Sequence, residues 1–354
     1  MLRQNRCLMN RFRIRSNIVA GLLLVACTAG AAPPLADSVP CAVRETLPAA
    51  TGTPAALTTE IAWVGSQPIE YWVHRATRPR ATLVFENGLM LQLTTWQRVV
   101  QLLADEADIV LYNRPGIGRS GAPEQPQGAT HTVGLLHELL RTQNLPAPYI
   151  LVGHSMGGQY SQLFARQYAS EVSAMLLVDA LPPGTFKPHS EFPWYTQLGL
   201  RLFAPAAVQR EIADAHEMGE LLLRENGPFD KPMIRLVASP DPAAGKPEGL
   251  LKDLLKGVIY AEDFGVWAVD PDIAEQRLDQ LYPHSVVRRL RAHHRMQEEA
   301  PDAVVEALRE LMAGAGCMPS GASIEGGWSA RHGILRAEPD RGNSDEEKPP
   351  DKAA

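Results

Sequence analysis

Residues 149–158, with the sequence YILVGHSMGG, decide the fold. The first four are apolar or aromatic, as is typical of a buried strand, and bulky residues at helical spacing follow from Tyr160 onward. Between the two segments, Gly153 and Gly157 stand two positions before and two positions after Ser155. In this context the G-x-S-x-G pattern predicts a nucleophile elbow, which is a sharp strand-to-helix turn with the serine hydroxyl exposed at its apex.

The chemistry of an activated serine explains this spacing. The strained turn packs well only if the residues two positions away are small, as Gly153 and Gly157 are. The turn also leaves the backbone N–H of Met156 free, at the positive end of the following helix, to stabilise a negatively charged oxygen. A glycine-rich turn with an inert serine can also match the G-x-S-x-G pattern. The predicted strand before it and the predicted helix after it favour a nucleophile elbow instead.

Outside this stretch, short apolar runs predict seven further strands, at 60–64, 69–73, 82–86, 109–112, 174–178, 233–238 and 286–290. Helical spacing predicts helices at 94–104, 133–145 and 206–224. Two early strands followed by alternating strands and helices predict an α/β fold with a mostly parallel, eight-stranded sheet flanked by helices. The alternation stops over residues 182–230, which we interpret as a small inserted cap.

Residues 1–26 have the features of a bacterial export signal, with five arginines, an apolar run at 18–26 and small residues after it. The sequence LVAC at 24–27 also resembles a lipobox, which predicts membrane anchoring through a lipid on Cys27. The alternative is ordinary cleavage near Ala31 with loss of Cys27, and the mass of the mature N-terminus distinguishes the two. Either route predicts an exported protein, in the periplasm or at the outer membrane, or else secreted.

The rest of the chain divides by composition. Residues 27–55 are rich in Ala, Pro and Thr and are predicted to form a tether, 56–330 the α/β domain with its cap, and 331–354 a disordered tail. Once Cys7 leaves with the signal and Cys27 carries its lipid, Cys41 and Cys317 remain in an oxidising compartment. We predict that these two form a disulfide, with two unpaired thiols as the alternative.

Charge and spacing exclude two classes of ligand. The formal net charge of −6 and the pI near 6.0 provide no basic surface for phosphates, so no nucleic-acid partner is expected. Residues 116–121, GIGRSG, match the dinucleotide pattern G-x-G-x-x-G. Pro123 and Pro126 follow, however, and interrupt the helix whose N-terminus would hold a pyrophosphate.

Over residues 56–312 the chain resembles the α/β-hydrolase family. Residues 112–120, YNRPGIGRS, resemble that family's Y-D-R-P-G-x-G-x-S loop, with Asn113 where aspartate is usual. Residues 85–89, FENGL, occupy the place of its H-G-x loop, with Asn87 in place of histidine. The resemblance implies that the backbone N–H of Leu89 joins that of Met156 in an oxyanion hole.

The resemblance also implies a catalytic triad in the order serine, acid, histidine. His294 has the spacing of the family's G-H-x-x-x-x-x-x-P turn, and His293 is the alternative. For the acid, Asp241 follows the apolar run at 232–238 and resembles the family's aspartate after the seventh strand. Asp179, at the end of the preceding strand, is the alternative, because some members of the family place the acid there.

These residues imply a serine hydrolase that cleaves carboxylic esters through an acyl-enzyme, acting on a small-molecule ester or amide. No metal and no organic cofactor is expected, because His284, His293 and His294 lack the carboxylate or cysteine company of a metal site. An aminopeptidase resembling the prolyl aminopeptidases is one alternative. Its amine would be bound by acidic cap residues, namely Glu191, Glu211, Asp214, Glu217 and Glu220. A non-catalytic envelope binding module is the other alternative.

Overall fold

The computed structural model describes residues 57–123, 128–224, 227, 229–239 and 264–315. The predicted export signal, tether and tail lie outside these ranges. So do Cys27, Cys41, Cys317 and Asp241.

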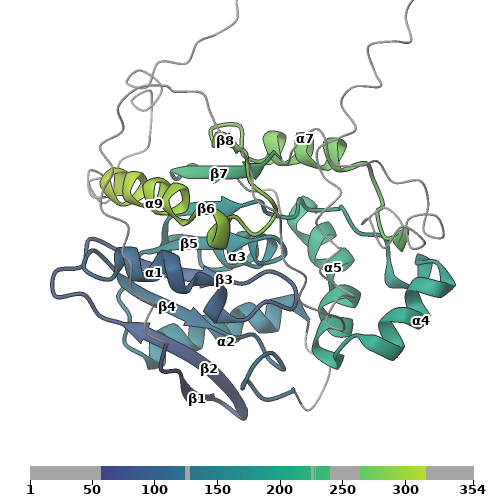
Figure 1. The fold of residues 1–354 in the computed structure, drawn as a ribbon, viewed down its shortest axis with the longest axis horizontal. Coiled ribbons are helices and arrows are strands. Elements are labelled where there is room, and N and C mark those ends of the chain that lie inside the picture. Colours follow the sequence, from purple (N-terminus) through teal and green to yellow (C-terminus); the bar gives the residue numbers. More distant parts are fainter. Residues whose placement is uncertain (1–56, 124–127, 225–226, 228, 240–263, 316–354) are drawn as a thin grey trace, which may run out of the picture. The chain divides into compact units, whose positions relative to one another are not determined.

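Eight strands form one sheet in the order β1-β2-β4-β3-β5-β6-β7-β8 (Figure 1). β1 pairs antiparallel with β2, β2 pairs antiparallel with β4, and the remaining neighbours are parallel. The mostly parallel, eight-stranded sheet predicted from the sequence is therefore confirmed. The strands are β1 (Glu60–Val64), β2 (Gln67–His74), β3 (Thr82–Glu86), β4 (Asp108–Tyr112), β5 (Tyr149–His154), β6 (Val172–Val178), β7 (Met233–Ala238) and β8 (Val286–Leu290).

Helices cover both faces of the sheet. One apolar core joins the sheet to α1, α8 and α9, and the other joins it to α2, α3, α5 and α7. The helices are η2 (Leu93–Trp96), α1 (Gln97–Leu103), α2 (Ala129–Thr142), α3 (Gly157–Gln167), η3 (Ala169–Glu171), η4 (His189–Glu191), α4 (Trp194–Phe203), α5 (Ala206–Arg224), α7 (Pro271–Leu281), α8 (Met296–Glu299) and α9 (Pro301–Ala315). Among these described helices, none is long and apolar enough to cross a bilayer.

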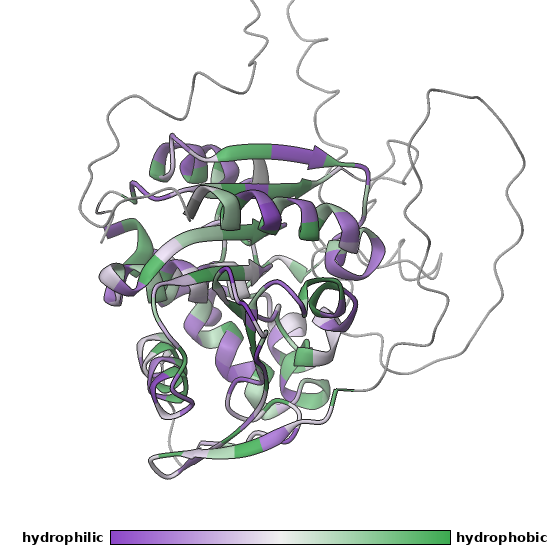
Figure 2. Cartoon of the chain, turned by 90° about the vertical axis from the view of Figure 1, so that its left-hand side faces the viewer, coloured by the Kyte–Doolittle hydropathy of each residue, from purple (hydrophilic) through white to green (hydrophobic). Residues whose placement is uncertain are grey.

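Burial follows the position of each strand in the sheet. β3, β4, β5 and β7 are buried along their whole length, as expected of parallel strands covered on both faces. β8 lies at the sheet edge and is only partly buried. Figure 2 shows the uppermost strand changing from hydrophobic to hydrophilic along its length, which fits the sequence VVRRL of β8.

The strand register brings together the ends that carry the candidate site. Glu86 of β3 lies beside Gly153 of β5, and His154 of β5 lies beside Val178 of β6. Val178 in turn lies beside Leu236 of β7. The loops that follow these parallel strands therefore leave the sheet at one edge, as ligand-binding loops do in open α/β sheets.

The segment between β6 and β7, which the sequence predicts to be a cap, contains η4, α4 and α5. Figure 1 shows α4 and α5 beside the sheet, with α5 nearer to it and α4 farther out. α5 turns a row of buried residues inward: Ala207, Val208, Glu211, Ile212, Ala215, Met218, Gly219 and Leu222. Helical spacing of 3–4 residues accounts for this row, in which Glu211 is the one carboxylate.

Two residues before and two residues after Ser155, the turn between β5 and α3 has room only for glycine. A Cβ on Gly153 would lie 2.6 Å from the Cα of Gly158, and a Cβ on Gly157 would lie 2.5 Å from the backbone oxygens of Glu86 and Asn87. Backbone atoms cannot move aside cheaply. The close packing of α3 against β5 therefore requires Gly153, and its close packing against the end of β3 requires Gly157.

We therefore predict that Gly157→Ala lowers the free energy of unfolding by about 1–3 kcal/mol, as overpacking typically does. Gly199→Ala is the matched control, because a Cβ at this position in α4 meets nothing within 4 Å. Alanine there should leave stability unchanged or raise it by up to about 1 kcal/mol through helix propensity. Urea unfolding of the two variants measures the contrast, and equal stabilities would contradict the packing argument.

Candidate active site

Ser155 adopts a backbone conformation that non-glycine residues rarely take. Its φ is +53° and its side chain is largely buried. Its N–H donates to the carbonyl of Val178 at 3.2 Å, and its own carbonyl accepts from Gly158 at 3.0 Å and Leu181 at 2.9 Å. Three hydrogen bonds thus hold a strained residue in place, an arrangement that is concentrated at functional sites.

Asp179 has the same kind of strained backbone, with a φ of +42°, directly after β6. Its Oδ2 lies 2.7 Å from Nδ1 of His294, and its Oδ1 accepts from the N–H of Ala238 at 2.9 Å. Burial raises the pKa of Asp179, but its hydrogen bond to His294, the His294 charge and the Ala238 N–H outweigh burial and lower the pKa below its usual value. An ionised carboxylate therefore faces the imidazole.

This contact bears on the choice between two predicted acids. Asp241, the first choice from the sequence, lies outside the described residues. Among the described residues, Asp179, the alternative, is the carboxylate that lies against His294. Asp179 directly follows β6, which pairs with β5, and Ser155 directly follows β5.

The adjacent residues His293 and His294 differ in exposure and in the carboxylate that each contacts. His293 lies with Nδ1 3.1 Å from the Glu299 carboxylate, and 65% of its side chain is exposed. Only 14% of the His294 side chain is exposed. Of the two candidates, His294 is thus the one beside the buried carboxylate.

His154, the variable residue of the elbow, supports the loop that carries His294. Its Nε2 lies 2.8 Å from the backbone oxygen of His294, and the two rings are 4.6 Å apart. A carbonyl only accepts, so Nε2 carries the proton. Within the described part of the chain, Nδ1 has no hydrogen-bond partner. Burial, with a smaller effect of the His294 charge, lowers the pKa of His154 to about 3, so its ring stays neutral beside His294.

The loop after β3 holds the second predicted oxyanion donor, Leu89. Asn87, which replaces the histidine usual in the α/β-hydrolase family, is buried and donates from Nδ2 to the carbonyl of Tyr112 at 2.7 Å. Its Oδ1 accepts from Nε1 of Trp96 at 3.0 Å. The following position, Gly88, has no room for a side chain, because a Cβ there would lie 2.8 Å from Nδ1 of His154. The asparagine side chain therefore anchors this loop.

Asn113 departs from the same family pattern for an electrostatic reason. Its Nδ2 donates to Oε2 of Glu70 at 2.7 Å, and its Oδ1 accepts from the N–H of Leu93 at 2.8 Å. An aspartate would place a second carboxylate against Glu70 and repel it. Burial raises the pKa of Glu70, but hydrogen bonds from the Arg119 N–H, Thr59 and Asn113 outweigh burial and lower it. The amide is therefore the residue that this position requires.

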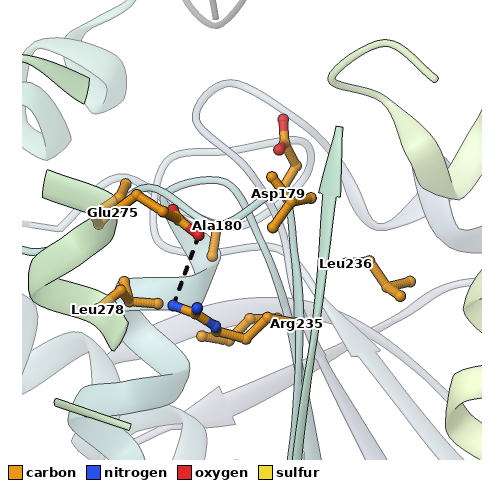
Figure 3. A pocket seen from close by; sticks show the side chains of 9 residues that line it. Asp179, Ala180, Arg235, Leu236, Glu275 and Leu278 are labelled. Carbon is orange, nitrogen blue, oxygen red and sulfur yellow. Dashed lines mark ion pairs between the residues drawn. The ribbon is translucent and has the colours of Figure 1, made fainter. Parts of the chain in front are cut away.

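A small cavity lies behind Asp179, between β7 and α7. Its volume of about 20 Å³ suits a single water molecule. Figure 3 shows Arg235 paired with Glu275 beside this cavity, at 3.7 Å, while the Asp179 carboxylate points away from both. Asp179 thus lines the cavity, but its carboxylate is bonded to His294 rather than to the Arg235–Glu275 pair.

The buried, neutral His154 predicts a pH dependence of stability. Unfolded histidine titrates near pH 6.5 whereas folded His154 titrates near 3, so only the unfolded state takes up a proton as the pH falls through this window. The contribution of His154 to the free energy of unfolding therefore falls on acidification, by about 2 kcal/mol between pH 7 and pH 5.

We expect the wild type to lose about 2 kcal/mol relative to His154→Gln over this range, measured by urea unfolding at both pH values. Gln offers an N–H at a similar reach and does not titrate. Glu86, whose pKa burial raises to about 7, contributes with the opposite sign, but it is present in both proteins and cancels. Parallel loss in both proteins would show that His154 is not held neutral.

Parts of the chain are similar to curated bacterial proteins. In Bacillus subtilis, the uncharacterized protein YqjL is 33% identical over 106 residues, which are 30% of this chain and 42% of that protein. The uncharacterized hydrolase YugF of the same organism is 31% identical over 116 residues, or 30% of this chain and 40% of that protein. The chain thus spans less than half the length of these curated relatives.

Solved structures show the same fold at low identity. A structure titled Cfl2 from Burkholderia cenocepacia matches with a TM-score of 0.53 at 19% identity, covering 72% of this chain and 95% of that one. A putative lipase from Acinetobacter baumannii matches with a TM-score of 0.52 at 18% identity, covering 73% and 92%. The epoxide hydrolase CorEH gives a TM-score of 0.53 at 16% identity, covering 73% and 99%.

The model of the alpha/beta hydrolase family matches residues 83–307, which extend from β3 into α9 and include Ser155, Asp179 and His294. Since this match covers more than half of the sequence, the chain belongs to the alpha/beta hydrolase family.

Proposed function

We propose that this hydrolase cleaves carboxylic esters through an acyl-enzyme, with Ser155 as nucleophile, His294 as general base and Asp179 as the triad acid. The contact of 2.7 Å between His294 and Asp179, at the sheet edge where Ser155 directly follows β5, carries the proposal. The pairing of a buried carboxylate with an imidazole is the arrangement that activates a serine hydroxyl.

In the proposed mechanism, Oγ of Ser155 attacks the ester carbonyl carbon while Nε2 of His294 takes the hydroxyl proton. Asp179 holds Nδ1–H and stabilises the imidazolium. The N–H groups of Leu89 and Met156 stabilise the oxyanion of the tetrahedral intermediate. Collapse expels the alcohol, which receives the proton from His294. Water then attacks the acyl-enzyme by the same steps and regenerates Ser155.

The neutral state of His154 favours this scheme. An imidazolium on His294 is needed in the transition state, and a charged His154 at a ring distance of 4.6 Å would oppose it. Because burial holds the pKa of His154 at about 3, His294 can become charged without a competing cation beside it. His154 acts here as a positioning residue through its bond to the His294 carbonyl.

The aminopeptidase alternative is less well supported. Of its five candidate acids, Glu191, Glu217 and Glu220 are exposed, and Glu211 is buried against Arg114 at 2.6 Å. Asp214 remains as one partly buried acid, whose pKa burial, Glu217 and Glu211 raise to about 6. We therefore favour esters, and a comparison of ester with prolyl-amide hydrolysis decides between them.

Covalent labelling tests the proposed nucleophile and separates it from a non-catalytic binding module. We expect a fluorophosphonate to form one adduct, on Ser155, located by peptide mapping and absent from Ser155→Ala. An unlabelled but well-folded wild type would rule out the mechanism and favour the binding module.

The two predicted acids are separated by matched substitutions. We expect Asp179→Asn to lower kcat by about 10⁴-fold, since the imidazole would lose its partner and its correct tautomer. Asp241→Asn should change kcat by less than about tenfold, which is a small effect on the transition-state scale. Steady-state hydrolysis of an aryl ester measures both variants, and the reverse order of effects would assign the acid to Asp241.

A further inference from the structure

Arg114, which follows β4, is a buried cation at the centre of the structure. Only 2% of it is exposed. Its Nε and Nη2 donate to the two carboxylate oxygens of Glu211, at 2.6 and 3.1 Å, and Nη1 donates to Glu86 at 3.2 Å. The ring of Tyr160 lies 4.7 Å from the guanidinium carbon. Three of the five guanidinium N–H groups are thus paired with carboxylates.

The remaining contacts of Arg114 are made to the loop after β3. Nη1 donates to the carbonyl of Asn87 at 2.6 Å, and Nη2 donates to the carbonyl of Gly88 at 3.1 Å. The carbonyl of Gly88 and the N–H of Leu89 belong to one planar, trans peptide unit, in which they point in opposite directions. Fixing the Gly88 oxygen therefore fixes the direction in which the Leu89 N–H points.

A cation bonded to the Gly88 carbonyl also polarises the Leu89 N–H at the other end of the same peptide unit, which makes this N–H a stronger hydrogen-bond donor. Charge-assisted hydrogen bonds are stronger than neutral ones, and a chain of hydrogen bonds polarises its members. Burial lowers the pKa of Arg114, but the carboxylates of Glu211 and Glu86 outweigh burial and hold the pKa well above its usual value. The charge on the loop is therefore permanent.

Glu211 brings the cap into this network, because it lies on the inward row of α5. The guanidinium is held on one side by Glu211 from the cap and on the other by Glu86 at the end of β3. Tyr112 donates to Glu86, which fixes the second carboxylate in turn. Two carboxylates from distant parts of the chain thus set one orientation of the fork.

We propose that Arg114 is a positioning residue for the oxyanion hole, aiming the Leu89 N–H through the Gly88 carbonyl, and that Glu211 couples the cap helix α5 to this function. The inference rests on the proposed ester hydrolysis. The donor is needed chiefly when the carbonyl oxygen becomes charged, so its misalignment lowers kcat with little change in KM.

The test uses Arg114→Gln, Arg114→Lys and Glu211→Gln in the full chain, with aryl ester hydrolysis as the readout. We expect Arg114→Gln to lower kcat by about 10- to 100-fold at nearly constant KM. This loss is smaller than the cost of about 10²- to 10³-fold for one lost donor, because the donor is misaligned rather than removed. Affinity for a boronic acid, which forms a tetrahedral adduct with serine, should fall by a similar factor. Arg114→Lys should recover part of kcat, because an ammonium can reach a carbonyl.

Glu211→Gln should have a smaller effect on kcat, since Arg114 keeps its bonds to both carbonyls. Glu211 acts through Arg114, so the double variant should lose no more activity than Arg114→Gln alone. Arg235→Gln is the matched structural control. Arg235 is also 2% exposed and pairs with the carboxylates of Glu275 and Asp279. It should lose stability with little change in kcat.

The inference is overturned if Arg114→Gln keeps the wild-type kcat, or if it raises KM alone. If Arg114→Gln does not fold, Arg114→Lys decides by the same criteria: a lower kcat at constant KM supports the proposal, and an unchanged kcat overturns it. Failure of the proposed function is distinguishable, since the wild type would then neither form the fluorophosphonate adduct at Ser155 nor hydrolyse esters.

Discussion

The tight turn from β5 to α3 is possible only because three residues in it, all glycines, have no side chain. Gly153, Gly157 and Gly158 each lie so close to another part of the chain that a Cβ would come within 2.6 Å of it. Ser155 is held between them with a left-handed backbone by bonds to Val178, Gly158 and Leu181. Since the turn packs against the ends of both β3 and β6, the loops that follow those strands have little freedom.

Buried polar groups then determine how each loop leaves the sheet. Asn87, Asn113 and Arg114 are nearly inaccessible to solvent, and each connects two or more segments by hydrogen bonds. Burying such groups is costly unless their partners are supplied, which makes the observed pairings specific for one arrangement. The two asparagines that depart from the family pattern fit this network, because one satisfies Tyr112 and Trp96 and the other donates to Glu70.

The strands and the elbow could be predicted from the sequence because apolar runs and glycine spacing are local signals. The observed strands differ from the predicted ones by at most two residues at either end. The acid is harder to predict, since both Asp179 and Asp241 follow apolar strands and local sequence does not tell which carboxylate meets His294. The contact between Asp179 and His294 joins residues 115 positions apart in the sequence, so it has no local signal.

Two features that were not predicted from the sequence have local signals, namely the burial of Glu211 and the helix α9. Glu211 resembles one of many exposed acids on a helix, yet its spacing from Val208, Ile212 and Ala215 places it on the buried face. α9 shows the same periodicity at Val304, Val305, Leu308 and Leu311. His154 occupies a variable position of the motif, and its bond to the His294 carbonyl, 140 residues away in sequence, has no local signal.

A crystal structure of the phosphonate adduct tests the central claim, that Ser155 is activated by His294 and Asp179 beside an oxyanion hole. We expect phosphorus on Oγ of Ser155, and its oxygen about 2.7–3.1 Å from the N–H groups of Leu89 and Met156. His294 should remain bonded to Asp179 and face the serine oxygen. An adduct on another residue, or a phosphoryl oxygen pointing away from both N–H groups, would contradict the account.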